Sequence, residues 1–256
     1  MKHYVIFILL FLMSGCGIYS KITAGRGVEY RIHVEATNQS NKTITEQAIK
    51  VTQNKLKAIG AEGEISPDPD DPQIFTAKIF EVKDPERLKQ FLFTSNQLEL
   101  RKVVSSGSPN PMQTYPTSAA AQKDVRGEQE VLSYKASEDT EEKFVIVEKE
   151  AIVTGDDIRD ASAVSDGSGF FSISFSLQPR GAAKLGDWTG KNINNYLAVI
   201  LDKKIRSSAY IKSQIFDSGA ISGRFTKSSA EDIALSLKSG YLPATMKILE
   251  EKKFGN

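Results

Sequence analysis

Stretches in which apolar and polar residues alternate lie between stretches whose apolar residues recur every three or four positions. Alternation is typical of a strand with one buried face, and the longer spacing is typical of an amphipathic helix. Helical spacing predicts a helix at 43–60 and a second one that begins at Asp84 and Pro85. Alternation predicts strands at 28–36, 73–80 and 97–104, and a weaker strand at 61–66.

The first of these helices carries local signals for both of its ends. Thr43 and Glu46 have the spacing of a capping box, and Gly60 suits the end of the helix. The resulting order is β-α-β-β-α-β, which is the order of a ferredoxin-like unit. We therefore expect an N-terminal base lobe of this kind over 28–104.

The segment 105–143 differs in composition from the regions on either side of it. Its first part, 105–118, is rich in serine, glycine and proline, and its last part, 136–143, is strongly charged. Few residues of the segment are suited to a core, so we expect an inter-lobe connection with room for a helix between Ser118 and Tyr134.

A second folded lobe is expected over 144–256. Its clearest strand is 170–178, where Phe171, Ile173, Phe175 and Leu177 alternate with polar residues. Helices are predicted within 179–192 and 228–243, the first ending at Gly190 and the second at Gly240. Further strands are predicted at 196–201, 210–216 and 245–251. Both lobes are therefore expected to be α+β, built from mixed sheets with helices on one face.

The start of the chain has the pattern of an exported protein. Lys2 precedes the apolar run 4–13, which is followed by two small residues and then by Cys16, the single cysteine of the chain. The run is shorter than the roughly 20 residues that span a bilayer. A basic start, a short apolar run and small residues before a cleavage point predict a signal peptide over 1–15.

The position of Cys16 resembles the lipobox of bacterial lipoproteins, in which the thiol is acylated and becomes the new N-terminus. Met13 stands where that pattern most often has leucine. We expect Cys16 to be the lipid attachment site and 16–27 to be a tether. An uncleaved anchor and an ordinary signal with an incidental cysteine are the alternatives.

The charge balance narrows the function classes. Lysine and arginine number 33 against 32 acidic residues, and removal of Lys2 with the signal leaves 32 against 32. A neutral chain argues against nucleic acid as a partner, because such binding needs a concentrated basic surface. The same balance predicts little salt dependence for any other binding. A single cysteine permits no internal disulfide, so stability must come from apolar burial.

Three blocks of the second lobe resemble a known family. The stretches 153–161, 188–226 and 230–255 are similar, in order and spacing, to the large extracytoplasmic domain of SecD, a membrane subunit of the bacterial protein-export machinery. The pieces "VILD", "ISGRFT" and "ALSLKSGYLPA" are specific in combination. The opening strand "GRGVEYRIHVE" is similar to the opening strand of the family's ferredoxin-like base. By this resemblance the first lobe corresponds to the family's base, and the second lobe corresponds to its head.

The resemblance implies a role in protein export. In SecD the proton-conducting residues lie in a membrane bundle, which has no counterpart here, so a retained role would be passive. We expect a binding module, not an enzyme, on the extracytoplasmic side of the membrane, with unfolded exported chains and Sec translocon subunits as partners and no cofactor. An envelope structural or interaction lipoprotein is the alternative, and a hydrolase ranks last.

Candidate ligand sites have simpler structural interpretations. The stretch "GDD" at 155–157 suits an aspartate turn that caps a helix near Ile158 better than a metal loop. The stretch "PDPDDP" at 67–72 suits a stiff hairpin tip better than a calcium site. Loss of His3 with the signal would leave His33 without a second histidine for a metal site, and Trp188 suits packing. The glycines of "GRG" and "SGR" are interpreted as turn residues.

Overall fold

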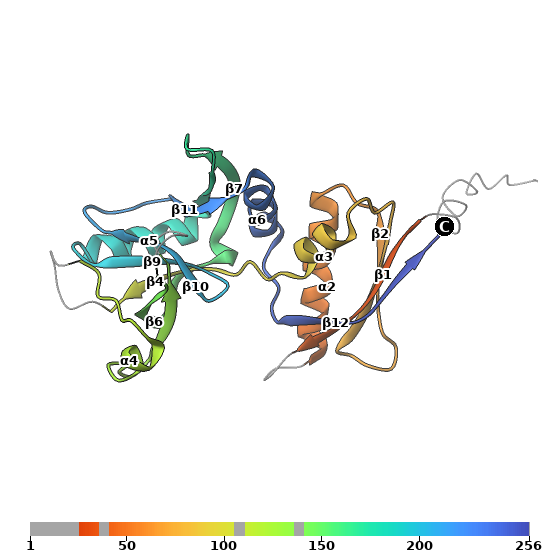
Figure 1. Cartoon of the computed structure of the whole chain (residues 1–256), viewed down its shortest axis with the longest axis horizontal. Coiled ribbons are helices and arrows are strands. Elements are labelled where there is room, and N and C mark those ends of the chain that lie inside the picture. Colours follow the sequence, from red (N-terminus) through yellow and green to blue (C-terminus); the bar gives the residue numbers. More distant parts are fainter. Residues whose placement is uncertain (1–25, 36–40, 105–110, 136–140, 256) are drawn as a thin grey trace, which may run out of the picture.

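The computed structural model describes residues 26–35, 41–104, 111–135 and 141–255. Two lobes lie side by side along the longest axis of the molecule (Figure 1). The ends of the described chain, at 26 and 255, lie together at the far end of the base lobe. None of the helices in the described ranges is long and apolar enough to cross a membrane.

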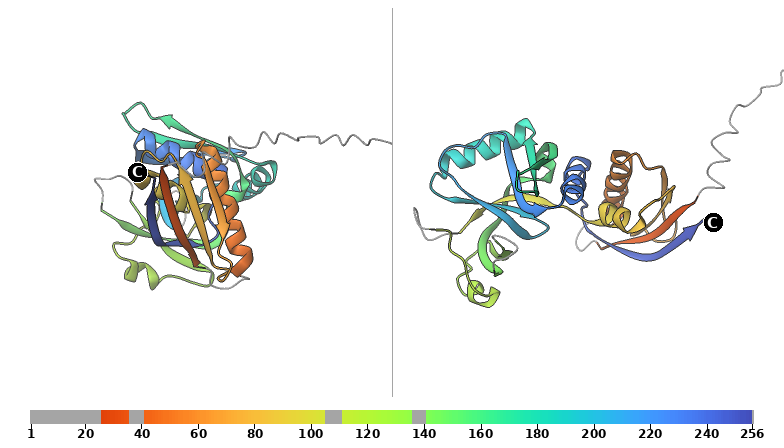
Figure 2. Two further views of the ribbon diagram at one scale, coloured as in Figure 1. Left: turned by 90° about the vertical axis from the view of Figure 1, so that its right-hand side faces the viewer. Right: turned by 45° about the horizontal axis from the view of Figure 1, so that its top comes forward.

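The base lobe is a four-stranded antiparallel sheet in the order β12-β1-β3-β2, with two helices on one face (Figure 2). Alternate residues of β1, including Tyr30 and Ile32, are buried against the helices. The strands are β1 (Gly27–Glu35), β2 (Gly63–Pro67), β3 (Ile74–Phe80) and β12 (Thr245–Phe254), and the helices are α2 (Asn41–Ala58) and α3 (Pro85–Phe93).

The fourth strand of this sheet comes from a different part of the chain than predicted. The strand expected at 97–104 is present as β4 (Leu98–Val103), but it pairs with strands of the head lobe. Its place beside β1 is taken by β12, which the sequence assigned to the head lobe. An alternating pattern specifies a strand and its buried face, but it does not specify the partner strand. The divisions at 28–104 and 144–256 are therefore wrong at these two strands.

The head lobe contains a closed five-stranded barrel in the order β10-β5-β6-β4-β9, in which β10 and β5 are parallel and the other pairs antiparallel. Beside it lies an antiparallel three-stranded sheet in the order β11-β8-β7. The remaining strands are β5 (Gln129–Tyr134), β6 (Lys143–Thr154), β7 (Ile158–Ser165), β8 (Phe171–Leu177), β9 (Tyr196–Leu201), β10 (Lys204–Tyr210) and β11 (Ser218–Phe225).

The segment 105–143 is more than a connection. Its described part contains the short helix α4 (Ser118–Gln122) and strand β5, which pairs with β6 over six positions. Leu132 of β5 is buried in the barrel core. The prediction failed because the polar residues on either side of this short strand dominate the composition of the segment.

The longer helices of the head lobe are α5 (Pro179–Lys191) and α6 (Lys227–Ser239). The strand predicted at 210–216 is absent, since β10 ends at Tyr210 and the residues that follow pack on α5. The Ile215 N–H donates to Thr189 Oγ1 at 2.9 Å, and Gln214 Nε2 donates to the Gly186 carbonyl at 3.0 Å. These polar groups bond to a helix and not to a strand ladder.

Candidate binding groove

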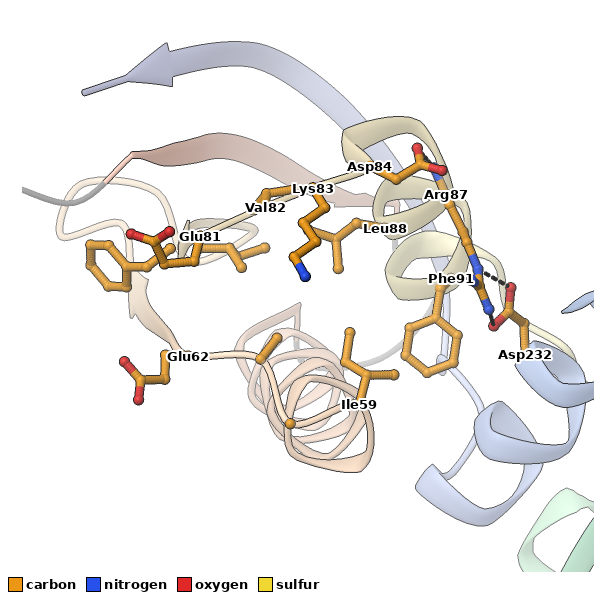
Figure 3. A pocket seen from close by; sticks show the side chains of 14 residues that line it. Ile59, Glu62, Glu81, Val82, Lys83, Asp84, Arg87, Leu88, Phe91 and Asp232 are labelled. Atoms are coloured by element: carbon orange, nitrogen blue, oxygen red, sulfur yellow. Dashed lines mark hydrogen bonds and ion pairs between the residues drawn. The ribbon is translucent and has the colours of Figure 1, made fainter. Parts of the chain in front are cut away.

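A cavity of about 660 Å³ opens in the base lobe where α2 ends and α3 begins (Figure 3). We call it the base groove. One wall comes from the end of α2, another from α3, and a third from the loop that joins β3 to α3. Asp232 of α6 reaches it from the head lobe. Its apolar lining residues are Ile59, Ala61, Ile79, Phe80, Val82, Leu88 and Phe91.

Local sequence signals create this opening. Gly60 has φ +65° and ends α2, which leaves Ile59 39% exposed at the groove. Glu81 has φ 53°, and its N–H donates to the Arg26 carbonyl at 2.7 Å, so the chain turns sharply after β3. Asp84 then caps α3 by accepting the Arg87 N–H at 3.0 Å. The two helices cover the sheet but do not meet at this end.

The charged groups of the base groove point in different directions. The ammonium of Lys83 extends into the cavity above the apolar wall, whereas the carboxylates of Glu62 and Glu81 extend outward at the rim (Figure 3). Within the described ranges, no carboxylate forms an ion pair with Lys83. The cavity therefore combines apolar walls with one unpaired cation.

An ion pair between the lobes closes one side of the base groove. Arg87 of α3 donates to Asp232 of α6 from Nε at 3.0 Å and from Nη2 at 2.9 Å (Figure 3). The carboxylate raises the pKa of Arg87 through these hydrogen bonds and its charge. A two-point contact fixes orientation better than a single one, so this pair positions α6 against the base lobe.

Behind the groove, a buried lysine holds the end of α3. The ammonium of Lys55 donates to three carbonyls at 3.1, 3.4 and 2.7 Å, those of Phe91, Leu92 and Thr94. A cation at the C-terminal end of a helix is favoured by the helix dipole. Burial nevertheless lowers the pKa of Lys55 to about 8, with the charge of Asp202 acting in the opposite direction.

Lys55 lies where the chain crosses between the lobes. Residues 94–97 lead from α3 to β4, and 240–244 lead back from α6 to β12. The two crossings are joined by Ser95 Oγ, which donates to the Leu242 carbonyl at 3.4 Å. Asp202 of the head lobe accepts the Gln97 N–H at 3.0 Å. Groups from both lobes thus hold the first crossing.

Sheet edges offer a second kind of binding surface. The barrel is closed, but β11 and β7 are the outer strands of the three-stranded sheet, and β2 and β12 those of the base sheet. Two residues before β11, Phe216 is 64% exposed. An outer strand presents unpaired backbone groups that an extended peptide can pair with.

The predicted site residues have mixed outcomes. Cys16 lies outside the described residues, so its role as the lipid attachment site remains a prediction. The "PDPDDP" stretch is a turn between β2 and β3, in which Asp68 Oδ1 accepts the N–H groups of Asp70 and Asp71. Arg31 bonds to the other oxygen of Asp68 at 2.9 Å.

The "GDD" stretch is a 3-10 turn, η1 (Gly155–Asp157), followed by strand β7 and not by the predicted helix. The fully buried Asp157 carboxylate accepts the Thr154 N–H at 3.2 Å and is paired with Arg180 and Lys184, both at 3.2 Å. These donors lower its pKa against the opposing effect of burial. In the described ranges, no three His, Cys, Asp or Glu residues are grouped as a metal site requires.

Other singled-out residues serve packing. Trp188 packs against the head core, and His33 lies opposite Lys247 and Ile74 in the base sheet. Gly27 and Gly223 lie within strands, not in turns as expected. A Cβ at Gly27 would lie 2.1 Å from the Ile79 carbonyl oxygen, so this position requires glycine because of close backbone approach.

The sequence did not reveal Lys55 or Lys83 as candidate residues. Lys55 lies among several other lysines on α2, and only its place on the helical face of Ala48 and Thr52 marks it as buried. Lys83 lies in the loop between β3 and α3, where no hydrophobic pattern or motif distinguishes it. A lysine at a helical core position is the one sequence signal that would have found the first of them.

Comparison with known proteins supports the family resemblance. Residues 129–244 match the family model of the SecDF P1 head subdomain. Protein translocase subunit SecD of Koribacter versatilis is 37% identical over 176 residues, which is 68% of this chain and 32% of the relative. The SecD of Aquifex aeolicus is 35% identical over 172 residues, which is 67% of this chain and 32% of the relative.

Solved structures agree with this result. One solved structure is of SecDF, described as a membrane component that enhances protein export. Its match covers 87% of this chain and 98% of the SecDF chain in that structure, with a TM-score of 0.64 and 24% identity. The match to a structure of SecDF in a super-membrane-facing form covers 89% of this chain and 30% of the SecDF chain, with a TM-score of 0.67 and 23% identity.

The chain therefore resembles the periplasmic domain of SecD, and the predicted α+β fold is confirmed. It spans about a third of the length of the SecD relatives named above. The structural likeness, at 23–24% identity, extends to the fold alone.

Proposed function

We propose that this protein is a SecD-like accessory module in protein export that holds unfolded exported chains by passive, reversible binding. The observation that carries the proposal is the 37% identity to protein translocase subunit SecD over 176 residues. The match to the P1 head subdomain supports the same role. Holding a chain needs reversible contacts and no catalytic group, so we infer a non-enzymatic function.

The base groove provides a surface for this binding. Its apolar walls can receive the side chains of a few exposed apolar residues, which a folded protein buries and an unfolded one presents. Ordering a flexible chain opposes binding by several kcal/mol. We therefore expect affinity in the micromolar range, roughly −8 kcal/mol.

The proposed location is the extracytoplasmic face of a membrane, with Sec translocon subunits as neighbours. The similarity to a translocase subunit supports the partners, and the signal-like start of the chain supports the location. Attachment through an acylated Cys16 is part of this proposal. Acylation with two or more chains would hold the protein durably, whereas one short chain binds only marginally.

The test is a titration of the whole chain, reconstituted in lipid nanodiscs, with a permanently unfolded secretory protein and with the same protein folded. We expect binding of the unfolded form alone. Ile59→Asp, which places a charge in the base groove, should weaken that binding about tenfold or more, since apolar contact is replaced by a solvated carboxylate. Empty nanodiscs give the background.

Leu249→Asp is the matched control, because Leu249 is a similarly exposed apolar residue of the base lobe, at 45%, and does not line the groove. It should leave the affinity unchanged. Equal affinity for folded and unfolded protein, or none for either, would remove the holding function and favour a structural envelope role. Unchanged affinity in Ile59→Asp would place binding elsewhere, with the β11 edge as the next surface to test.

A further inference from the structure

We propose that the base groove selects apolar segments that carry an acidic side chain, with the ligand's carboxylate bound by Lys83. This inference rests on the proposed function and adds a chemical class to its substrate. It concerns the unfolded segments seated in the groove, not the protein as a whole.

The placement of Lys83 is the first argument. Its ammonium extends into the cavity, above a wall that includes Leu88 and Phe91 (Figure 3). Among the described residues it has no ion-pair partner. A ligand seated on the apolar wall displaces water around the ammonium, and an ion pair is stronger where water is displaced.

The other charges of the base groove are already engaged or face outward. Asp84 accepts the Arg87 N–H as the cap of α3, and Arg87 is paired with Asp232. The carboxylates of Glu62 and Glu81 extend away from the cavity (Figure 3). Lys83 is therefore the charged group of the groove that remains for a ligand inside it.

This local charge alters the expectation drawn from composition. The chain as a whole is close to neutral, which predicted little salt dependence. A short segment seated in the groove contacts the groups that extend into the cavity, and among the labelled charged residues Figure 3 shows the Lys83 ammonium there while the carboxylates of Glu62 and Glu81 extend outward. Salt screens such a contact the more, the more it is exposed to water. Binding of acidic segments should thus weaken as salt is added.

The experiment uses three unfolded peptides with one apolar core flanked by aspartates, asparagines or lysines. Each is titrated against the whole chain in nanodiscs of uncharged lipid. We expect the aspartate peptide to bind about two- to fivefold more tightly than the asparagine peptide, which is the range of an exposed ion pair. The lysine peptide should bind less tightly than either.

Replacement of Lys83 by glutamate separates the effect of this lysine from the effect of the other charges on the protein. Lys83→Glu should invert the order of the peptides, whereas Lys247→Glu, an exposed lysine outside the groove with the same change in net charge, should preserve it. Unchanged order in Lys83→Glu, or tighter binding of the lysine peptide by the unaltered chain, would overturn the inference and point to the rim carboxylates. Equal binding of all three peptides would overturn it while leaving the holding function intact, and no binding of any would remove both.

Discussion

At the scale of single residues, Lys55 combines two opposing effects. Its ammonium satisfies three carbonyls at the end of α3, yet its burial lowers its pKa to about 8. A folded-state pKa below the usual 10.5 means that, between about pH 8 and 10.5, the unfolded chain binds more protons than the folded one. Stability from this group therefore rises with pH in that window.

The first residue-scale prediction concerns the replacement Lys55→Met. At pH 7 it should lower the free energy of unfolding by about 1–2 kcal/mol, since the carbonyls lose their donor while a buried charge is removed. At pH 9.5 the deficit should be larger by about 1–2 kcal/mol, because the native chain gains stability from pH 8 upward and the variant does not. Urea denaturation at both pH values measures this.

The denaturation measurements stop at pH 9.5 so that the titration of a second group, Tyr30, does not contribute. Burial raises the pKa of Tyr30 to about 12, so above pH 10 the unfolded chain loses a proton that the folded one keeps. Tyr30 therefore lowers stability at still higher pH. A deficit that is the same at pH 7 and 9.5 would show that Lys55 keeps an ordinary pKa in the folded chain.

At the scale of elements, strand β12 completes the base sheet. It pairs with β1 from Gly27↔Phe254 to Glu35↔Thr245, and its Met246 and Ile248 pack against the base core. Without it, β1 would become an outer strand with one side of the core open.

Removal of 245–256 should therefore destabilise the base lobe alone. We expect the amides of β1, β3 and α2 to lose most of their protection from hydrogen exchange, while those of the barrel strands keep theirs. Hydrogen exchange followed by mass spectrometry, read from peptides of both lobes, measures this. A chain shortened only by residues 255 and 256 is the control. Undiminished protection in β1 would mean that the three remaining strands suffice.

The sequence was informative about elements and less so about their partners. The signals at Asp84 and Gly240 located helix ends, because caps depend on neighbouring residues. The alternation at 97–104 and 245–251 located two strands, but their exchange between lobes depends on pairing with strands that lie roughly 50 to more than 200 residues away in the sequence. The base groove was not predicted, because the 39% exposure of Ile59 depends on where α3 packs.

At the scale of the whole molecule, the Arg87–Asp232 pair links the lobes beside two covalent crossings. We predict a coupling energy of about 0.5–1 kcal/mol between these partners, because the pair is partly exposed to solvent. A double-mutant cycle of Arg87→Ala and Asp232→Ala in urea measures the coupling, which should shrink in 1 M salt. Strictly additive single replacements would show that the pair does not hold the lobes together.

The exchange of strands also affects the order in which the chain can fold. Thr245 follows Phe80 by about 165 residues, so a chain that emerges from its N-terminus presents β1 and β3 long before β12 exists. The head lobe, whose elements run without interruption from β4 to α6, can complete itself in the meantime. The base sheet is then closed last, and until that moment the free edge of β1 is the part of the nascent protein most in need of a chaperone.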